Sequence, residues 1–122
     1  MALSIKPYIE NKERIHLIGI GGVSMNSLGE LLFSRGVPVS GSDRLRTDVT
    51  ARLEALGAKI TYEHKAENVE GAALIVRTAA VHDDNPEIVR AHELGIPVME
   101  RAEAWGHLMR DYDNVVCLAG TH

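Results

Sequence analysis

The stretch HLIGIGGVSMN at residues 16–26 places Gly19, Gly21 and Gly22 between an apolar run and an apolar pattern of helical spacing. Three glycines in four residues cost backbone entropy that a plain turn between a strand and a helix does not require. Gly19 would permit a tight turn, and Gly21 would let the backbone approach an anion with no Cβ in the way. The helix that follows would direct unpaired N–H groups and the positive end of its dipole at that anion. The pattern therefore predicts a strand, a phosphate-binding turn and a helix.

The match of this turn to the dinucleotide fingerprint is incomplete. That fingerprint reads G-x-G-x-x-G, and Ser24 occupies the position of its third glycine. A serine can still pack closely there, and its hydroxyl could donate to a phosphate. The turn alone does not name the ligand.

Strand and helix patterns alternate along the rest of the chain. Short apolar runs predict strands, the fourth of them a central one, at residues 15–20, 37–40, 59–62, 72–76, 96–99 and 115–118. Apolar residues at helical spacing predict helices between them, with glycine stops at Gly36, Gly57 and Gly95. This rhythm predicts an α/β fold, a Rossmann-like, mostly parallel sheet with helices on both faces.

Local signals mark where the predicted helices begin. Thr47 and Asp48 would open one helix. Asn85 would cap another, with Pro86 in its first turn and Glu87 facing the positive end of the helix dipole. A last helix is predicted from a stripe of apolar residues, namely Ala102, Trp105, Leu108 and Met109.

The domain organisation is predicted from the charged segment near the end of the chain. Residues 1–109 would form one domain, and residues 110–114 a hinge. Residues 115–122 would then be the first strand of a following domain, running into the start of a phosphate loop at Gly120, Thr121 and His122. Such a loop needs a further glycine, a lysine and a serine or threonine. The strand Val115–Leu118 would pair with this domain's sheet edge or with another copy of the chain.

The composition argues against several classes of function. The net charge of −4 does not favour a surface for nucleic acid or anionic membranes, which needs clustered positive charge. No apolar run approaches the ~18 residues that span a bilayer. The single cysteine, Cys117, excludes an internal disulfide and fits a reducing cytoplasm.

Two further segments would lie at the carboxyl edge of the sheet. Asp43 ends the SGSD stretch, where an acid in a nicotinamide-binding fold takes the ribose hydroxyls, and its alternative role is to start a turn or cap a helix. After the fourth strand, small residues would let a ligand lie over the sheet edge. Arg77 and the hydroxyl of Thr78 could bind an acidic or sugar-bearing ligand there.

The six histidines do not predict a metal site, because none of them has the spacing of metal ligands. They are His16, His64, His82, His92, His107 and His122. The spacing of the residues does not support a catalytic nucleophile either. His16 would either orient the glycine turn through a hydrogen bond or simply occupy a strand face. We therefore predict neither a metal ligand nor a catalytic residue within this chain.

Taken together, these stretches resemble the amino-terminal domain of the Mur ligases, most of all the branch that adds L-alanine to UDP-N-acetylmuramate in peptidoglycan synthesis. The stretches that carry the resemblance cover almost the whole chain in family order: HLIGIGG (16–22), VSGSD (39–43), TAAV (78–81), DNPE (84–87), GIPVMERAE (95–103) and AGTH (119–122). The main departure is Ser24, where the family usually has glycine.

The resemblance implies that this domain binds the UDP part of UDP-N-acetylmuramate. The glycine turn and the following helix would hold the diphosphate, Asp43 would lie toward the uridine, and His64 and Asn68 match a segment near the uracil side. The implied contact residues are Gly19, Gly21, Gly22, Val23, Ser24, Asp43, His64, Asn68, Thr78, Ala79 and Ala80.

The resemblance also implies a cytoplasmic whole enzyme that uses ATP and Mg²⁺, bound by a central domain, while a third domain places the amino acid. The muramyl carboxylate would be activated as an acyl phosphate, which L-alanine attacks. The residues in hand would hold no cofactor and have no ligase activity, since Gly120–His122 is only the front of the ATP loop. The alternative function is a nicotinamide-binding domain of an oxidoreductase or an NAD sensor, which Asp43 favours and Ser24 disfavours.

Overall fold

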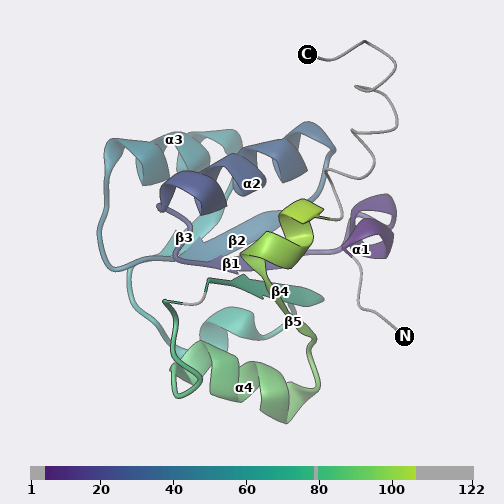
Figure 1. The fold of residues 1–122 in the computed structure, drawn as a ribbon. Coiled ribbons are helices and arrows are strands. Elements are labelled where there is room, and N and C mark those ends of the chain that lie inside the picture. The colour runs from purple at the N-terminus through teal and green to yellow at the C-terminus, as the bar shows by residue number, and fades with distance from the viewer. Residues whose placement is uncertain (1–4, 79, 107–122) are drawn as a thin grey trace.

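A computed structural model describes residues 5–78 and 80–106 of the chain (Figure 1). Its elements, in chain order, are α1 (Lys6–Glu10), β1 (Ile15–Ile18), α2 (Val23–Ser34), β2 (Val39–Ser42), α3 (Asp48–Leu56), β3 (Lys59–Thr61), the 3₁₀ helix η1 (Ala66–Val69), β4 (Leu74–Arg77), α4 (Pro86–Leu94) and β5 (Val98–Glu100). Residues 101–106 are also helical.

The five strands form one parallel sheet in the order β3-β2-β1-β4-β5. The chain builds outward from β1 to β3 on one side, then crosses back and builds outward again from β4. The order therefore reverses between β1 and β4, and in open parallel sheets ligands bind outside the carboxyl ends of the strands at such a point. The predicted α/β fold with a parallel sheet is confirmed.

Helices cover both faces of the sheet (Figure 1). One core cluster joins α2 and α3 to the sheet through residues such as Leu28, Leu53 and Leu17. A second, smaller cluster joins α4 and η1 to the opposite face, through residues such as Ile88 and Val69. The prediction of helices on both faces is confirmed.

The predicted helix signals act as expected. The Thr47 side chain accepts a hydrogen bond from the amide of Thr50 at the start of α3, and the Asn85 side chain accepts one from the amide of Glu87 at the start of α4. Gly57 and Gly95 end these two helices in the left-handed conformation, which glycine adopts without strain.

All five predicted strands within the described residues need corrected bounds; for example, the strand predicted at 96–99 is Val98–Glu100. The second strand is Val39–Ser42, not 37–40, because Pro38 has no N–H to donate and the pairing with β1 starts at Val39. The strand predicted as central is Leu74–Arg77, an internal strand, while β1 takes the middle of the sheet.

Several predictions lie outside the described residues. They concern Leu108 and Met109 of the last helix, the hinge at residues 110–114, the strand Val115–Leu118 and the loop start Gly120–His122. Within residues 5–78 and 80–106, none of the helices combines the length and the apolar character that crossing a bilayer requires.

Candidate functional site

The glycine turn is held by its own backbone hydrogen bonds. The amides of Gly19 and Ile20 donate to the carbonyl of Ser42 at 2.8 and 3.1 Å, and the amide of Gly22 donates to the carbonyl of Gly19 at 3.0 Å. The amide of Gly21 donates to the Asp43 carboxylate at 2.8 Å. All four amides of the turn therefore have acceptors. The donors left for an anion are the first-turn amides of α2, which have no acceptor within the helix.

The start of α2 differs from the starts of α3 and α4. Its N-cap is Gly22, which has an extended backbone and no side chain to bind the first-turn amides. An anion at this position would find both free N–H groups and the positive end of the helix dipole. Val23 and Ser24, two of the predicted contact residues, form this first turn.

Asp43 connects the end of β2 to the glycine turn. One of its carboxylate oxygens accepts from the amide of Gly21, and the other accepts from the amides of Arg44 and Leu45, at 2.7 and 3.2 Å. The alternative prediction that Asp43 organises a turn is therefore confirmed. A direct contact of Asp43 with a nucleoside stays a prediction.

Glycine at position 21 has a second role besides the one predicted. A Cβ there would lie 2.7 Å from the Asp43 carboxylate and 3.0 Å from a methyl group of Thr50, because the turn packs directly against the ends of β2 and α3. A larger residue would therefore strain the fold itself. The role of Gly21 in the approach of an anion stays a prediction.

A cavity of about 520 Å³ opens at the carboxyl edge of the sheet. Its lining comes from the segments after β2, β3 and β4, namely Arg44, His64, Ala80, Val81, His82, Asp84, Asn85 and Pro86. His64 and Ala80 were predicted as contact residues, and Thr78 lies two residues before Ala80, whereas Ala79 lies outside the described residues. The sequence reasoning missed Arg44, and it identified His82, Asp84, Asn85 and Pro86 only as turn and cap signals.

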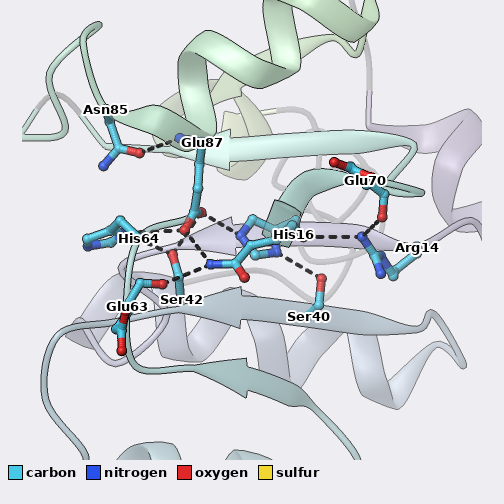
Figure 2. A network of polar contacts seen from close by, with 10 residues as sticks. Arg14, His16, Ser40, Ser42, Glu63, His64, Glu70, Asn85 and Glu87 are labelled. Carbon is cyan, nitrogen blue, oxygen red and sulfur yellow. Dashed lines mark hydrogen bonds and ion pairs between the residues drawn. The ribbon is translucent and has the colours of Figure 1, made fainter. Parts of the chain in front are cut away.

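A buried polar network lies beside this cavity, between the sheet and α4 (Figure 2). Its centre is Glu87, which is completely buried. One Glu87 oxygen lies 2.7 Å from Nε2 of His16 and accepts from the Ser42 hydroxyl at 2.9 Å. The other accepts from the Asn68 amide at 2.8 Å and lies 3.4 Å from Nδ1 of His64.

The network changes the interpretation of three predicted residues. His16 does not orient the glycine turn, because its two ring nitrogens face Ser40 on the neighbouring strand β2 and Glu87 on α4. Asn68 was predicted near the ligand, but its amide nitrogen donates to Glu87 and to the carbonyl of Glu63. Glu87 was predicted as a helix-dipole acid, and its buried contacts went unpredicted. One signal in the sequence could have indicated such a network. Ser40 and Ser42 alternate in a short strand, and buried polar side chains require hydrogen-bond partners.

The electrostatic balance at Glu87 favours the ionised form. Burial alone would raise the pKa of the Glu87 carboxyl, but the hydrogen bond and charge of His16, with the hydrogen bonds from Asn68 and Ser42, outweigh burial. The net result is a pKa below the ordinary value of 4.5. The position of Glu87 in the first turn of α4 acts in the same direction.

Acid should therefore destabilise the fold through Glu87. A carboxyl whose pKa is lower in the folded chain stabilises the fold above its unfolded pKa, and this contribution is lost as the pH falls through the folded pKa. We expect the free energy of unfolding, measured with urea, to fall as the pH is lowered from about 5 through the folded pKa of Glu87. Glu87→Gln should be less stable at neutral pH and should show a smaller loss over this range. An equal loss in both chains would contradict the assignment.

Arg77 lies in a different place from the one predicted. Its guanidinium binds the Asp83 carboxylate and the carbonyl of Val81. It lines a second cavity with Asp83, His92, Glu100 and Glu103, away from His64. The Arg77 guanidinium holds the pKa of the exposed Asp83 carboxyl below its ordinary value. The prediction that Arg77 binds the ligand beside Thr78 is not supported by this arrangement.

The described part of the chain contains no group of three or more histidine, cysteine, aspartate or glutamate side chains placed to hold a metal ion. The candidate site combines the N–H groups at the start of α2 with the lining of the cavity, and the Glu87 network lies beside it.

Curated proteins with similar sequences include enzymes named UDP-N-acetylmuramate–L-alanine ligase. The chain is 49% identical over 110 residues to the UDP-N-acetylmuramate–L-alanine ligase of Geobacter sp. (strain M21), which covers 90% of this chain and 24% of that protein. It is 45% identical over 113 residues to the enzyme of the same name from Clostridium novyi (strain NT), covering 93% and 25%. The chain thus spans about a quarter of the length of the curated relatives it matches.

A solved structure supports the same relationship. The UDP-N-acetylmuramate-alanine ligase MurC from Thermotoga maritima aligns with a TM-score of 0.72 at 41% identity, covering 82% of this chain and 22% of that one. The sequence profile of the Mur ligase family, catalytic domain, matches residues 14–113. This match takes in the sheet, the glycine turn and the Glu87 network, and the chain belongs to the Mur ligase family.

Proposed function

We propose that this chain is the substrate-binding amino-terminal part of an ATP-dependent ligase that joins L-alanine to UDP-N-acetylmuramate. Its own share of the reaction is to bind the UDP portion of the nucleotide sugar. The observation that carries the proposal is the convergence, at the carboxyl edge of one parallel sheet, of an uncapped helix start and a polar cavity.

The position of the diphosphate follows from the hydrogen bonds of the turn. The amides of the glycine turn already donate to Ser42, Gly19 and Asp43, so the diphosphate would be held by the first-turn amides of α2. The three glycines of the turn, Gly19, Gly21 and Gly22, would allow the tight backbone path that brings the start of α2 close to the sheet. Asp43 would fix that shape through its hydrogen bond to the amide of Gly21, and it would lie toward the uridine.

The nucleoside would lie in the cavity beyond the ends of β2, β3 and β4. His64, Arg44 and Ala80 line this cavity. Thr78 and Ala79 would contact the nucleotide sugar in the proposal. Asn68 would act indirectly, because it holds the segment before η1 through Glu63 and Glu87.

The remaining parts of the reaction belong to the rest of the longer protein in this proposal. ATP and Mg²⁺ would bind to a central domain, whose loop would begin at Gly120–His122, and a third domain would place L-alanine. The relatives' names support the L-alanine branch. The solved UDP-N-acetylmuramate:L-alanyl-gamma-D-glutamyl-meso-diaminopimelate ligase from Neisseria meningitides is less similar, with 26% identity and a TM-score of 0.67 over 73% of this chain and 28% of that one.

Calorimetry on this chain tests the proposal. Separate titrations with UDP-N-acetylmuramate, UDP and NADH should give binding of the first two, with NADH at least about tenfold weaker, a difference of about 1.4 kcal/mol. Binding of NADH without binding of UDP or UDP-N-acetylmuramate would support the alternative function, a nicotinamide-binding domain. ATP with Mg²⁺ serves as a further control, and specific ATP binding by this chain would contradict the division of labour proposed here.

A further inference from the structure

The buried network contains an unusual relay from a carboxylate to a residue of the cavity. Glu87 is buried on α4 and does not line the cavity, whereas His64 lines it and keeps 18% of its side chain exposed. The two are joined through Ser42, whose hydroxyl donates to Glu87 and whose oxygen lies 3.1 Å from Nδ1 of His64 (Figure 2).

The positions of the protons in this relay follow from counting donors. A serine hydroxyl has one proton, and an ionised carboxylate only accepts. A hydrogen bond to a charged oxygen is stronger than one to a neutral ring, so the Ser42 proton belongs to Glu87. The Ser42 oxygen can then only accept, and Nδ1 of His64 must carry the donating proton. The second Glu87 oxygen, 3.4 Å from the same Nδ1, also favours a proton there.

We propose that Glu87 is a positioning residue of the nucleotide site, which acts through Ser42 to fix the neutral His64 ring as its Nδ1–H tautomer. Nε2 of His64 then meets the cavity as a hydrogen-bond acceptor. The site would thereby favour a ligand group that carries an N–H or O–H donor at this point. This inference rests on the proposed function for the identity of the ligand, but the tautomer itself does not depend on a ligand.

The first test measures the tautomer without ligand. Imidazole ¹⁵N shifts of this chain, recorded at about pH 8 where an ordinary histidine is neutral, should show a protonated Nδ1 and an unprotonated Nε2 at His64. Glu87→Gln keeps the shape but places an amide donor near Nδ1, so His64 should lose the Nδ1–H tautomer. Ser42→Ala removes the relay but leaves the second Glu87 oxygen 3.4 Å from Nδ1, so it should lower the population of the Nδ1–H tautomer without abolishing it.

Ser40→Ala is the matched control. Ser40 lies on the same strand and face as Ser42, but its hydroxyl contacts Nδ1 of His16. This variant should leave the His64 tautomer as it is. Amide spectra and thermal melts establish that each variant is folded, and Ser42→Ala keeps the test decisive if Glu87→Gln fails to fold.

The second test measures binding with UDP as the probe. Glu87→Gln should weaken UDP binding about tenfold, and Ser40→Ala should change it by less than about twofold. An Nε2–H tautomer in the unaltered chain would overturn the proposal, as would a folded Glu87→Gln chain that keeps the Nδ1–H form. If the unaltered chain bound no UDP while the tautomer results held, the proposed function would fail and the positioning role of Glu87 toward His64 would stand.

Discussion

Replacing Gly41 by alanine should destabilise the fold by about 3 kcal/mol or more, at the upper end of what overpacking of a core costs. Gly41 lies in β2, paired with Leu17 of β1. A Cβ there would lie 2.6 and 2.7 Å from carbons of Ile20 and 2.9 Å from the Leu17 carbonyl oxygen. Ile20 is completely buried, and the carbonyl belongs to the backbone of the central strand, so neither can move aside without disturbing the sheet.

A thermal melt followed by circular dichroism measures this effect. For a domain of this size, the expected loss corresponds to a melting temperature lower by about 10 °C or more. Gly106→Ala is the control, since a Cβ at Gly106 meets nothing within 4 Å and the residue is helical. Equal melting temperatures for Gly41→Ala and the unaltered chain would show that the contact between Ile20 and β2 has been misjudged.

Gly21→Val should abolish measurable binding of UDP-N-acetylmuramate, a loss of more than about a hundredfold or about 2.7 kcal/mol. The valine would meet the Asp43 carboxylate and the Thr50 methyl group at Cβ, before its own methyl groups are counted. Asp43 would have to leave the amide of Gly21, and the turn would no longer hold the start of α2 in place. Stability should fall as well, by about 1–3 kcal/mol.

A double variant separates this mechanism from simple obstruction of the ligand. If the Asp43 carboxylate is the main obstacle to a Cβ, Gly21→Ala and Asp43→Ala should be non-additive, with the double variant more stable than the sum of the single effects predicts. Urea unfolding of the four chains gives this coupling. Strict additivity, or full ligand affinity in Gly21→Val, would contradict the role assigned to the turn.

The helix boundaries were predictable because their signals are local. Thr47 and Asn85 bind amides two or three residues away, and Gly57 and Gly95 adopt a backbone conformation that other residues avoid. Each signal acts within one turn of chain, so the sequence carries it without knowledge of the fold. The alternation of such units with apolar strands was enough to predict a parallel sheet.

The features that the sequence reasoning missed depend on distant partners. Glu87 has an ordinary helix-start pattern around it, and only the packing of α4 on β1 and β2 brings it to His16 and Ser42. The local sequence does not reveal that Gly41 lacks room for a Cβ, because the obstructing atoms belong to the Ile20 side chain and the Leu17 carbonyl. Asp43 was placed at the correct edge of the sheet, but both of its carboxylate oxygens also accept hydrogen bonds from backbone amides, which the sequence did not reveal.

An amide NMR titration of this chain with UDP-N-acetylmuramate tests the central claim most directly, because it locates the bound nucleotide. The account predicts shifts at the first turn of α2, at Arg44 and His64, and along residues 80–85, with little change around the second cavity near His92. Shifts confined to the second cavity, or a spectrum unchanged by the ligand and by UDP, would contradict the assignment of this sheet edge as the nucleotide site.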